Sequence, residues 1–362
     1  MEIKIQKTDL LNAVNTVSKS IPSRGTMPIL ECVLITVGNG EIRFTSNDTE
    51  VETDYFTSEG EIIEDGTIAV DSKIFCPIVQ KLPNGEVSIK AVESELNIKC
   101  GRAKFNIPVR DGSEFPSMEN VSQNDGISMT QEELKALIRQ TIFSLSVNDG
   151  NKIMTGCLFE IKGDKLKIVA LDGHRVAIRE KDLGKSYDDV SVIIPGKTLQ
   201  NILKILGDGE IEIFFAANMA AFKFNQTLVT SRLIDGQFFD ISQMLNNDYI
   251  TEMTVNNDEL TACLERALLL INGQDRKPVI FNITDNSLET EMTTNMGSST
   301  ESLEIVKTGN DIRIGFNPTF IADALRVVDD EEVKFCFSGE KAPCYIKGDG
   351  YTYLILPIQI PG

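Results

Sequence analysis

The sequence predicts an α+β protein built from three copies of one unit, each with two helices packed on antiparallel strands. Three amphipathic segments carry apolar residues spaced three and four apart, and their first leucines, Leu10, Leu134 and Leu260, lie 124 and 126 residues apart. A second helix also recurs, each time followed by a turn and a strand of alternating polarity. Because element order and spacing recur together, we interpret the chain as one unit repeated three times rather than three unrelated domains.

The first helix of each unit has one apolar face. Its members are Leu10, Val14, Val17 and Ile21 in the first unit, Leu134, Ile138, Ile142 and Leu145 in the second, and Leu260, Leu264, Leu268 and Ile271 in the third. Thr130 and Asn256 are predicted N-caps, because each precedes a glutamate by three residues. Thr8 has the corresponding place in the first unit but lacks that acid.

The second helix is predicted over 73–82, 197–206 and 319–328, and Pro77 is expected to kink the first copy. The strands that follow begin at Glu86, Glu210 and Glu332, after turns such as 83–85 and 207–209. Alternating polarity at 41–45, 165–169 and 311–314 predicts further half-buried strands. Polar stretches at 122–125 and 246–248 are predicted linkers, which places the domains at 1–122, 126–246 and 250–362.

The composition excludes several classes of protein. Hydrophobic residues make up 41% and charged residues 25%, and no apolar run approaches the about 18 residues that span a bilayer, so a cytoplasmic globular protein is expected. The seven cysteines form no C-x-x-C pair and are expected to be reduced and buried. A single histidine, His174, excludes chemistry built on paired histidines, and the phosphate-binding and metalloprotease motifs are absent. We therefore expect no metal, no cofactor and no catalytic residue.

The charge is unevenly distributed along the chain. The net charge is −19, which by itself argues against a nucleic-acid partner. The six predicted helix bodies, however, hold nine basic residues and two acids, Glu265 and Asp323, which leaves −26 elsewhere. The basic residues are Lys19, Lys73, Lys81, Lys135, Arg139, Lys197, Lys204, Arg266 and Arg326. A basic helical surface in an acidic protein favours DNA held against the helices alone, without sequence preference.

Five short segments, in this order on a threefold repeat, resemble the DNA polymerase III beta subunit family, the bacterial sliding clamps. They are 23–30, 101–105, 171–177, 235–240 and 353–358, and the resemblance extends along essentially the whole chain. It implies three tandem DNA-clamp domains in a head-to-tail homodimer that closes into a ring, with helices lining the hole. The implied role is a non-catalytic processivity factor that encircles double-stranded DNA.

The resemblance also implies partners and sites. Partners would be DNA, a second copy, the DNA polymerase III alpha subunit, the clamp loader and other clamp-motif proteins of replication and repair, and no membrane. The implied peptide-binding pocket consists of Met154, Leu171, Gly173, His174, Arg175, Val176, Phe239, Gln243, Met244, Leu354, Leu356, Pro357 and Ile358. DNA-facing residues would be the helix cations other than Arg326, together with Arg24 and the loop 148–152, which includes Lys152. The subunit joint would bring Phe105 and Ile107 against Leu269 and Leu270.

Simpler interpretations remain open for these residues. Leu171, Phe239, Gln243 and Gln359 depart from the commoner family pattern, which leaves the preferred peptide motif undefined. The 172–175 segment is also compatible with a plain turn, the C-terminal apolar run with an edge strand, Arg24 and Lys152 with solvated side chains, and the joint residues with ordinary core. Two further functions stay as alternatives: a peptide-docking hub not loaded on DNA, and an enzyme using Asp172 and His174 as general base.

Overall fold

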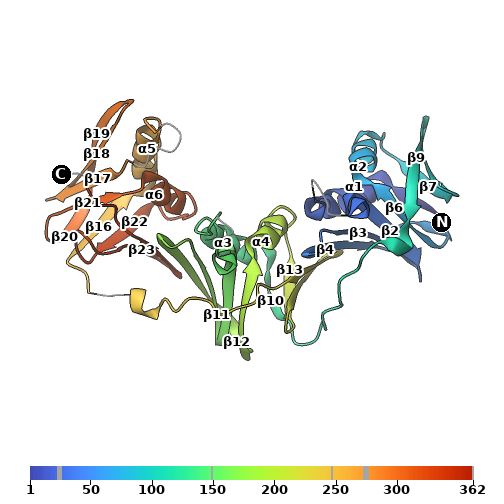
Figure 1. Ribbon diagram of the computed structural model, residues 1–362, viewed down its shortest axis with the longest axis horizontal. Coiled ribbons are helices and arrows are strands. Elements are labelled where there is room, and N and C mark those ends of the chain that lie inside the picture. Colours follow the sequence, from blue (N-terminus) through green and yellow to red (C-terminus); the bar gives the residue numbers. More distant parts are fainter. Residues whose placement is uncertain (23–26, 148–149, 246–247, 272–276, 361–362) are drawn as a thin grey trace. The chain divides into compact units, whose positions relative to one another are not determined.

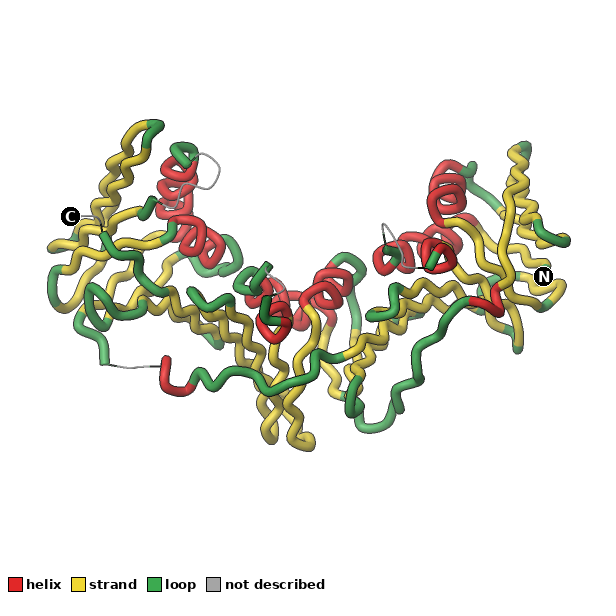
Figure 2. Tube along the Cα trace, viewed as in Figure 1, coloured by secondary structure: helices red, strands yellow, loops and turns green. Residues whose placement is uncertain are grey.

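The computed structural model describes residues 1–22, 27–147, 150–245, 248–271 and 277–360. The chain divides into two compact units, one formed by Met1–Lys135 with Lys197–Leu233 and the other by Ala136–Gly196 with Ile234–Gly362. Each unit therefore takes part of the middle repeat. Figure 2 shows that strands make up most of both units and that the helices are few.

The first unit is built on one antiparallel sheet of thirteen strands among the described residues (Figure 1). The strands, in order across the sheet, are β10 (Ile127–Thr130), β13 (Glu210–Phe215), β14 (Met219–Phe224), β15 (Thr227–Arg232), β4 (Val51–Thr57), β3 (Glu41–Asn47), β2 (Cys32–Gly38), β6 (Gly66–Asp71), β9 (Ala103–Asp111), β8 (Glu95–Cys100), β7 (Glu86–Val92), β1 (Glu2–Gln6) and β5 (Glu61–Glu64). Because β15 of the second repeat pairs with β4 of the first, the sheet crosses the repeat boundary.

Two helices of the first repeat, α1 (Lys7–Val17) and α2 (Ser72–Lys81), lie side by side against this sheet (Figure 1). Leu10, Val14 and Val17 are fully buried, as their spacing predicts. Thr8 does not have the capping position that its place in the repeat suggested, because α1 begins at Lys7; its N-cap residue is Gln6, whose side chain makes no capping hydrogen bond. The helix α4 (Gly196–Leu203) begins at the chain boundary between the two units.

The second unit holds two antiparallel sheets. The larger has, in order, β11 (Gly156–Leu171), β12 (Arg175–Pro195), β24 (Tyr351–Ile355), β23 (Cys344–Gly348), β22 (Glu332–Phe337), β16 (Thr251–Asn256) and β20 (Val306–Gly309). The smaller has β19 (Gly297–Glu304), β18 (Ser287–Thr294), β17 (Val279–Thr284) and β21 (Ile312–Phe316). Pairing of β12 with β24 joins the middle repeat to the last one in a single sheet.

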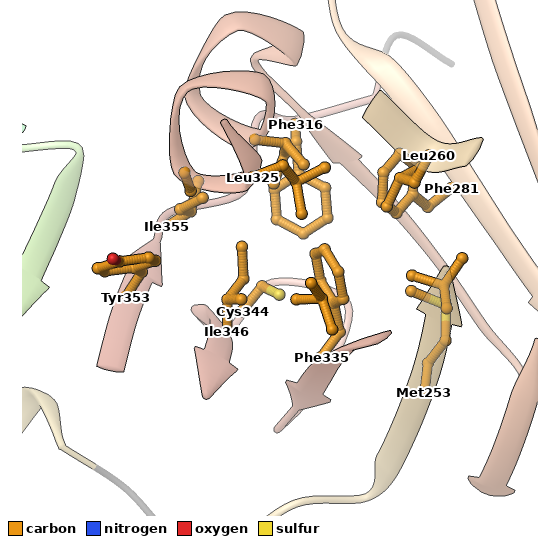
Figure 3. Packing of buried hydrophobic residues seen from close by; sticks show 14 of the residues in the cluster. Met253, Leu260, Phe281, Phe316, Leu325, Phe335, Cys344, Ile346, Tyr353 and Ile355 are labelled. Carbon is orange, nitrogen blue, oxygen red and sulfur yellow. The ribbon is translucent and has the colours of Figure 1, made fainter. Parts of the chain in front are cut away.

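The core of the last repeat lies between these sheets and the helices α5 (Asn257–Leu268) and α6 (Pro318–Leu325). Figure 3 shows the aromatic side chains that meet there. The ring of Phe281 lies 5.6 Å from that of Phe316 and 6.5 Å from that of Phe335, in edge-on contacts. Leu260 of α5 and Leu325 of α6 are buried in the same cluster, so both helices are fixed by their apolar faces.

The predicted N-caps of α3 (Gln131–Ile142) and α5 are confirmed. Thr130 and Glu133 exchange hydrogen bonds, the Thr130 hydroxyl accepting from the Glu133 backbone N–H at 3.2 Å and the Glu133 carboxylate from the Thr130 N–H at 3.0 Å. The Asn256 side chain accepts from the Glu259 N–H at 3.0 Å. Both helices end earlier than predicted. Leu145 and Ile271 lie beyond the last helical residue, in tighter turns whose hydrogen bonds run from residue i to residue i−3.

Two carboxylates are buried on β4, where the sheets of the first two repeats join. Glu52 and Asp54 are 5% and 1% exposed, and their spacing of two places them on one face of the strand. The side chain of Arg43 donates two hydrogen bonds to Asp54, at 2.7 and 2.9 Å, and offsets its charge. Buried carboxylates require such partners, because water no longer solvates them.

Among the described residues, the hydrogen-bond donors to Glu52 are neutral groups. Its carboxylate accepts hydrogen bonds from the Asn47 amide and from the backbone N–H of Met118, both at 3.0 Å. The Asn47 amide also donates to the Pro116 carbonyl, so this cluster ties the segment after β9 to β4. Burial, with a smaller contribution from the nearby charge of Asp54, raises the pKa of Glu52 to about 7 against the opposing hydrogen bonds and the charge of Arg43.

The seven cysteines are all free and buried, as predicted. Burial raises the pKa of Cys76 to about 11 and that of Cys157 to about 12, which keeps both as unreactive thiols. Within the part of the chain that the structure describes, no helix is long and apolar enough to cross a bilayer. The domain boundaries at 1–122, 126–246 and 250–362 stay predictions, because continuous sheets run across the repeats.

Candidate functional site

The turn between β11 and β12 is closed by Asp172. One carboxylate oxygen accepts hydrogen bonds from the backbone N–H groups of His174 at 2.9 Å and Arg175 at 3.1 Å. Gly173 adopts a positive φ of 87°, a conformation that favours glycine at this position. The carbonyl of His174 accepts from the N–H of Leu356, which fixes the C-terminal segment beside the turn.

Arg175 anchors this turn to the last repeat. Its guanidinium donates to Asp172 at 3.0 Å and to Asp323 of α6 at 2.8 Å, and its side chain is 9% exposed. The same group lies 4.4 Å from the centre of the Phe320 ring and 5.5 Å from that of Phe143. Asp172 therefore neutralises Arg175 and closes a turn, which leaves its carboxylate unavailable as a base partner for the His174 imidazole.

A cavity of about 450 Å³ opens beside the turn and has a predominantly apolar wall. Of the predicted pocket residues, the structure brings together Met154, Leu171, Gly173, His174, Arg175, Val176, Phe239, Gln243, Met244, Leu354 and Leu356. Phe239, Met244 and Leu356 are among the exposed large hydrophobic side chains. An apolar cleft with a few polar groups at its rim suits an extended peptide with hydrophobic anchors.

Two predicted pocket residues do not line this cavity. Pro357 and Ile358 face a neighbouring hollow with Arg313 and Lys341, because the backbone of Ile358 turns away to pair with Gly315.

Four lining residues were not predicted: Ser338, Ala342, Pro343 and Tyr345. They come from β22–β23 and the loop between them, where the sequence shows only an alternating strand and a turn. The Tyr345 hydroxyl donates to the Met244 carbonyl at 2.6 Å and so holds one rim of the cavity. The Ser338 hydroxyl oxygen is buried and has no hydrogen-bond partner among the described residues.

The helix cations fall into two groups. Five of them form ion pairs: Lys73 with Glu31, Arg139 with Asp329, Lys197 with Asp48, Arg266 with Glu301, and Arg326 with Glu265. The hydrogen bond from Arg266 lowers the pKa of Glu301. Lys19, Lys81, Lys135 and Lys204 are exposed and have no acidic side chain within 4.0 Å among the described residues. The excess positive charge of the helices is thus partly offset locally.

The other predicted DNA contacts are located only in part. Lys152 is exposed at the start of a short 3-10 helix, Lys152–Thr155, where Asn151 caps the backbone. Arg24 and residues 148–149 lie outside the described residues.

The predicted joint residues differ in exposure. Leu269 is 82% exposed and Phe105 is 39% exposed, whereas Leu270 is half-buried. Ile107 is 7% exposed and belongs to the core of the first repeat, which supports the simpler interpretation for that residue. Met296 was not predicted, yet it is 64% exposed in the turn after β18, which the Thr294 hydroxyl ties to the Leu270 carbonyl at 2.9 Å.

The two predicted joint surfaces, around Phe105 and around Leu269, each border a strand edge that has no further strand partner among the described residues. Within the described ranges, residues 103–108 of β9 pair with β8 alone, because β6 pairs only with residues 109–111 of β9. The other edge, β19, closes the smaller sheet of the second unit and pairs only with β18 among the described residues. An exposed edge of this kind is a template for pairing with another chain.

Comparison with known proteins gives consistent matches along the chain. Three family profiles match in tandem: the N-terminal domain of the DNA polymerase III beta subunit over residues 1–119, its central domain over 128–240 and its C-terminal domain over 242–359. The beta sliding clamp of Staphylococcus aureus is 30% identical over 374 residues, with 99% of each chain covered.

Two crystal structures are similar along their whole length. A protein of Eubacterium rectale described as a DNA polymerase III beta subunit is 46% identical, covers 99% of this chain and 100% of its own, and has a TM-score of 0.96. The DNA polymerase sliding clamp of Bacillus subtilis is 29% identical, with both chains fully covered and a TM-score of 0.94.

Proposed function

The chain belongs to the DNA polymerase III beta subunit family, the sliding clamps, and we propose that it is a processivity factor whose homodimer encircles duplex DNA. The observation that carries this proposal is the tandem match of three clamp domains over residues 1–359. A clamp supplies no chemistry. It raises the effective concentration of a polymerase at the primer end by tethering it.

The homodimer is proposed to form between the two free strand edges, β9 of one copy and β19 of the other. A head-to-tail contact of this kind uses different surfaces on each chain and closes into a ring after two copies. Exposed Lys104 lies on the β9 edge and exposed Arg102 in the turn before it, whereas β19 carries the exposed Glu304, so these charges are complementary. Phe105 and Leu269 would supply the apolar centre of the contact.

DNA binding is proposed to depend on the exposed helix lysines Lys19, Lys81, Lys135 and Lys204. The five helix cations that form ion pairs must give up a carboxylate partner to bind a phosphate, which weakens their net contribution to DNA affinity. Modest affinity fits a protein that must slide, because ring closure rather than contact strength would retain it on DNA. The acidic remainder of the chain repels DNA elsewhere.

The cavity beside His174 is proposed to bind short segments of partner proteins. Its volume of about 450 Å³ accommodates two or so hydrophobic side chains, which suits the apolar anchors of an extended peptide. We propose the DNA polymerase III alpha subunit, the clamp loader and other clamp-motif proteins as its ligands. The chain itself would be non-catalytic, and replication places it in the cytoplasm.

The test is loader-dependent stimulation of polymerase processivity on primed circular DNA. We expect product length in a single binding event to rise when the chain and a cognate loader are both present. Unchanged product length with an active loader would contradict the proposal. If the pocket still bound partner peptides in that case, the protein would be a docking hub that is not loaded on DNA.

A further inference from the structure

Asp323 of α6 lies between two arginines that belong to different surfaces. One of its carboxylate oxygens accepts a hydrogen bond from Arg175 at 2.8 Å, and the other lies 3.6 Å from the guanidinium of Arg326. Arg175 is part of the pocket wall and is nearly buried. Arg326 ends α6, is 47% exposed and also pairs with Glu265 at 3.1 Å. One carboxylate therefore joins the pocket to the accessible end of a helix.

The pocket wall depends on the Arg175 end of this link. Arg175 is held by Asp172 and Asp323 and packs on Phe320, so loss of Asp323 would leave a buried cation with one carboxylate fewer. Asp172 also fixes the backbone of His174, a lining residue of the cavity. A shift of Arg175 is thus transmitted to the wall that a peptide would contact.

The Arg326 end is open to competition. A phosphate near Arg326 attracts its guanidinium and repels the carboxylate of Asp323. Because Asp323 also contacts Arg175, it then interacts with that buried cation alone. The turn that carries His174 becomes more firmly held, and a more rigid site binds its ligand with a smaller entropic cost.

We infer that Asp323 couples the two sites, so that DNA at α6 increases the affinity of the pocket for peptides. This inference rests on the proposed function. Thermodynamic linkage makes the effect reciprocal, so a bound peptide strengthens DNA binding by the same factor. Partial exposure of Arg326 screens the interaction, so we expect about a two- to fivefold change in peptide affinity.

The test measures a fluorescein-labelled synthetic peptide with a leucine and a phenylalanine near its C-terminus, by anisotropy, against the intact homodimer at low salt. Titrations with and without a saturating short duplex give the coupling factor. For the wild type, we expect tighter peptide binding with DNA. D323N should bind peptide more weakly and lose the DNA effect, while binding DNA at least as well because an acid has been removed.

Two further variants separate coupling from general damage. E265Q also removes an acid that contacts Arg326 but does not reach Arg175, so it should retain the gain in peptide affinity. R326Q leaves Asp323 to Arg175 even without DNA, so this variant should bind peptide about as tightly as the DNA-bound wild type and gain nothing further from DNA. His174 is the only histidine in the chain, so its ¹⁵N-labelled imidazole gives a single NMR reporter of the wall. DNA should shift this signal in the wild type and not in R326Q.

The outcomes distinguish this inference from the function on which it rests. If peptide and DNA each bind but the coupling factor is one, the inference is overturned and the proposed function stands. An unchanged coupling factor in both D323N and R326Q would also overturn it. A wild-type protein that binds neither peptide nor DNA would contradict both.

Discussion

The buried Glu52 predicts a pH dependence of stability that a neutral replacement removes. A folded-state pKa of about 7, against an ordinary value near 4.5, means that the folded protein binds this proton more tightly than the unfolded chain. The stability contributed by protonated Glu52 is therefore present below about pH 4.5 and is lost as the pH rises through 7. Over the whole pH range this titration changes the free energy of unfolding by about 3 kcal/mol, and about 2 kcal/mol of that change falls between about pH 5.5 and about pH 8.5.

Glu52→Gln keeps the shape of the side chain and removes the titration. Urea unfolding followed by circular dichroism, at several pH values across this range, gives the free energy of unfolding of both proteins. Relative to wild type, we expect the free energy of unfolding of the variant to increase by about 2 kcal/mol between about pH 5.5 and about pH 8.5. Glu50→Gln, an exposed neighbour on the turn before β4, controls for the loss of one charge.

A difference between wild type and Glu52→Gln that does not change with pH would refute the reasoning. Glu52 would then not change its protonation between these pH values, and burial beside Asp54 would not raise its pKa into this range. An opposite slope would show that the ionised form is the better hydrogen-bonded one.

Three further predictions address the proposed surfaces. Leu356→Ala should weaken binding of the labelled peptide by roughly 5- to 30-fold in anisotropy titrations, whereas Leu245→Ala, equally exposed at 38% but outside the cavity, should not. Leu269→Asp should reduce the mass seen by light scattering to the 40.0 kDa of one chain, and a persistent dimer would remove this residue from the joint. Lys135→Ala should reduce the magnitude of the slope of log affinity for duplex DNA against log salt concentration by about 0.9. Lys165→Ala, on the exposed part of β11, should leave this slope unchanged. Equal effects of the two variants would exclude a special role for α3 in DNA binding.

Periodic features were predicted well from the sequence, because they depend on local spacing. The strands that follow the second helices begin at Glu86, Glu210 and Glu332, as predicted, and the capping residue Asn256 acts as expected. Helix ends were less accurate. Ile271 continues the apolar pattern of α5, yet the helix ends at Leu268, because an apolar residue can pack on the core from a turn as well as from a helix.

Most of the pocket was predicted through resemblance, since its residues come from distant segments that no periodicity connects. Ser338 and Tyr345 were missed because their contribution arises from the register of β23 with β22 and with β24, which is a tertiary property. Arg175 was predicted, but its partner Asp323 had only been counted as an acid on a helix. Likewise, the basic helix residues could be counted from the sequence, while their ion pairs with Glu31, Asp48 and other acids required the folded chain.

The central claim is that the protein is retained on DNA by encircling it, and retention on circular DNA tests this directly. The homodimer is loaded onto a nicked circle by a cognate loader, separated from free protein by gel filtration at moderate salt, and followed after a restriction enzyme cuts the circle. Topological retention predicts that the protein elutes with the intact circle and is released when the ends are opened. Protein that never elutes with the circle, or that stays on the linear product as firmly as on the circle, would contradict a sliding ring.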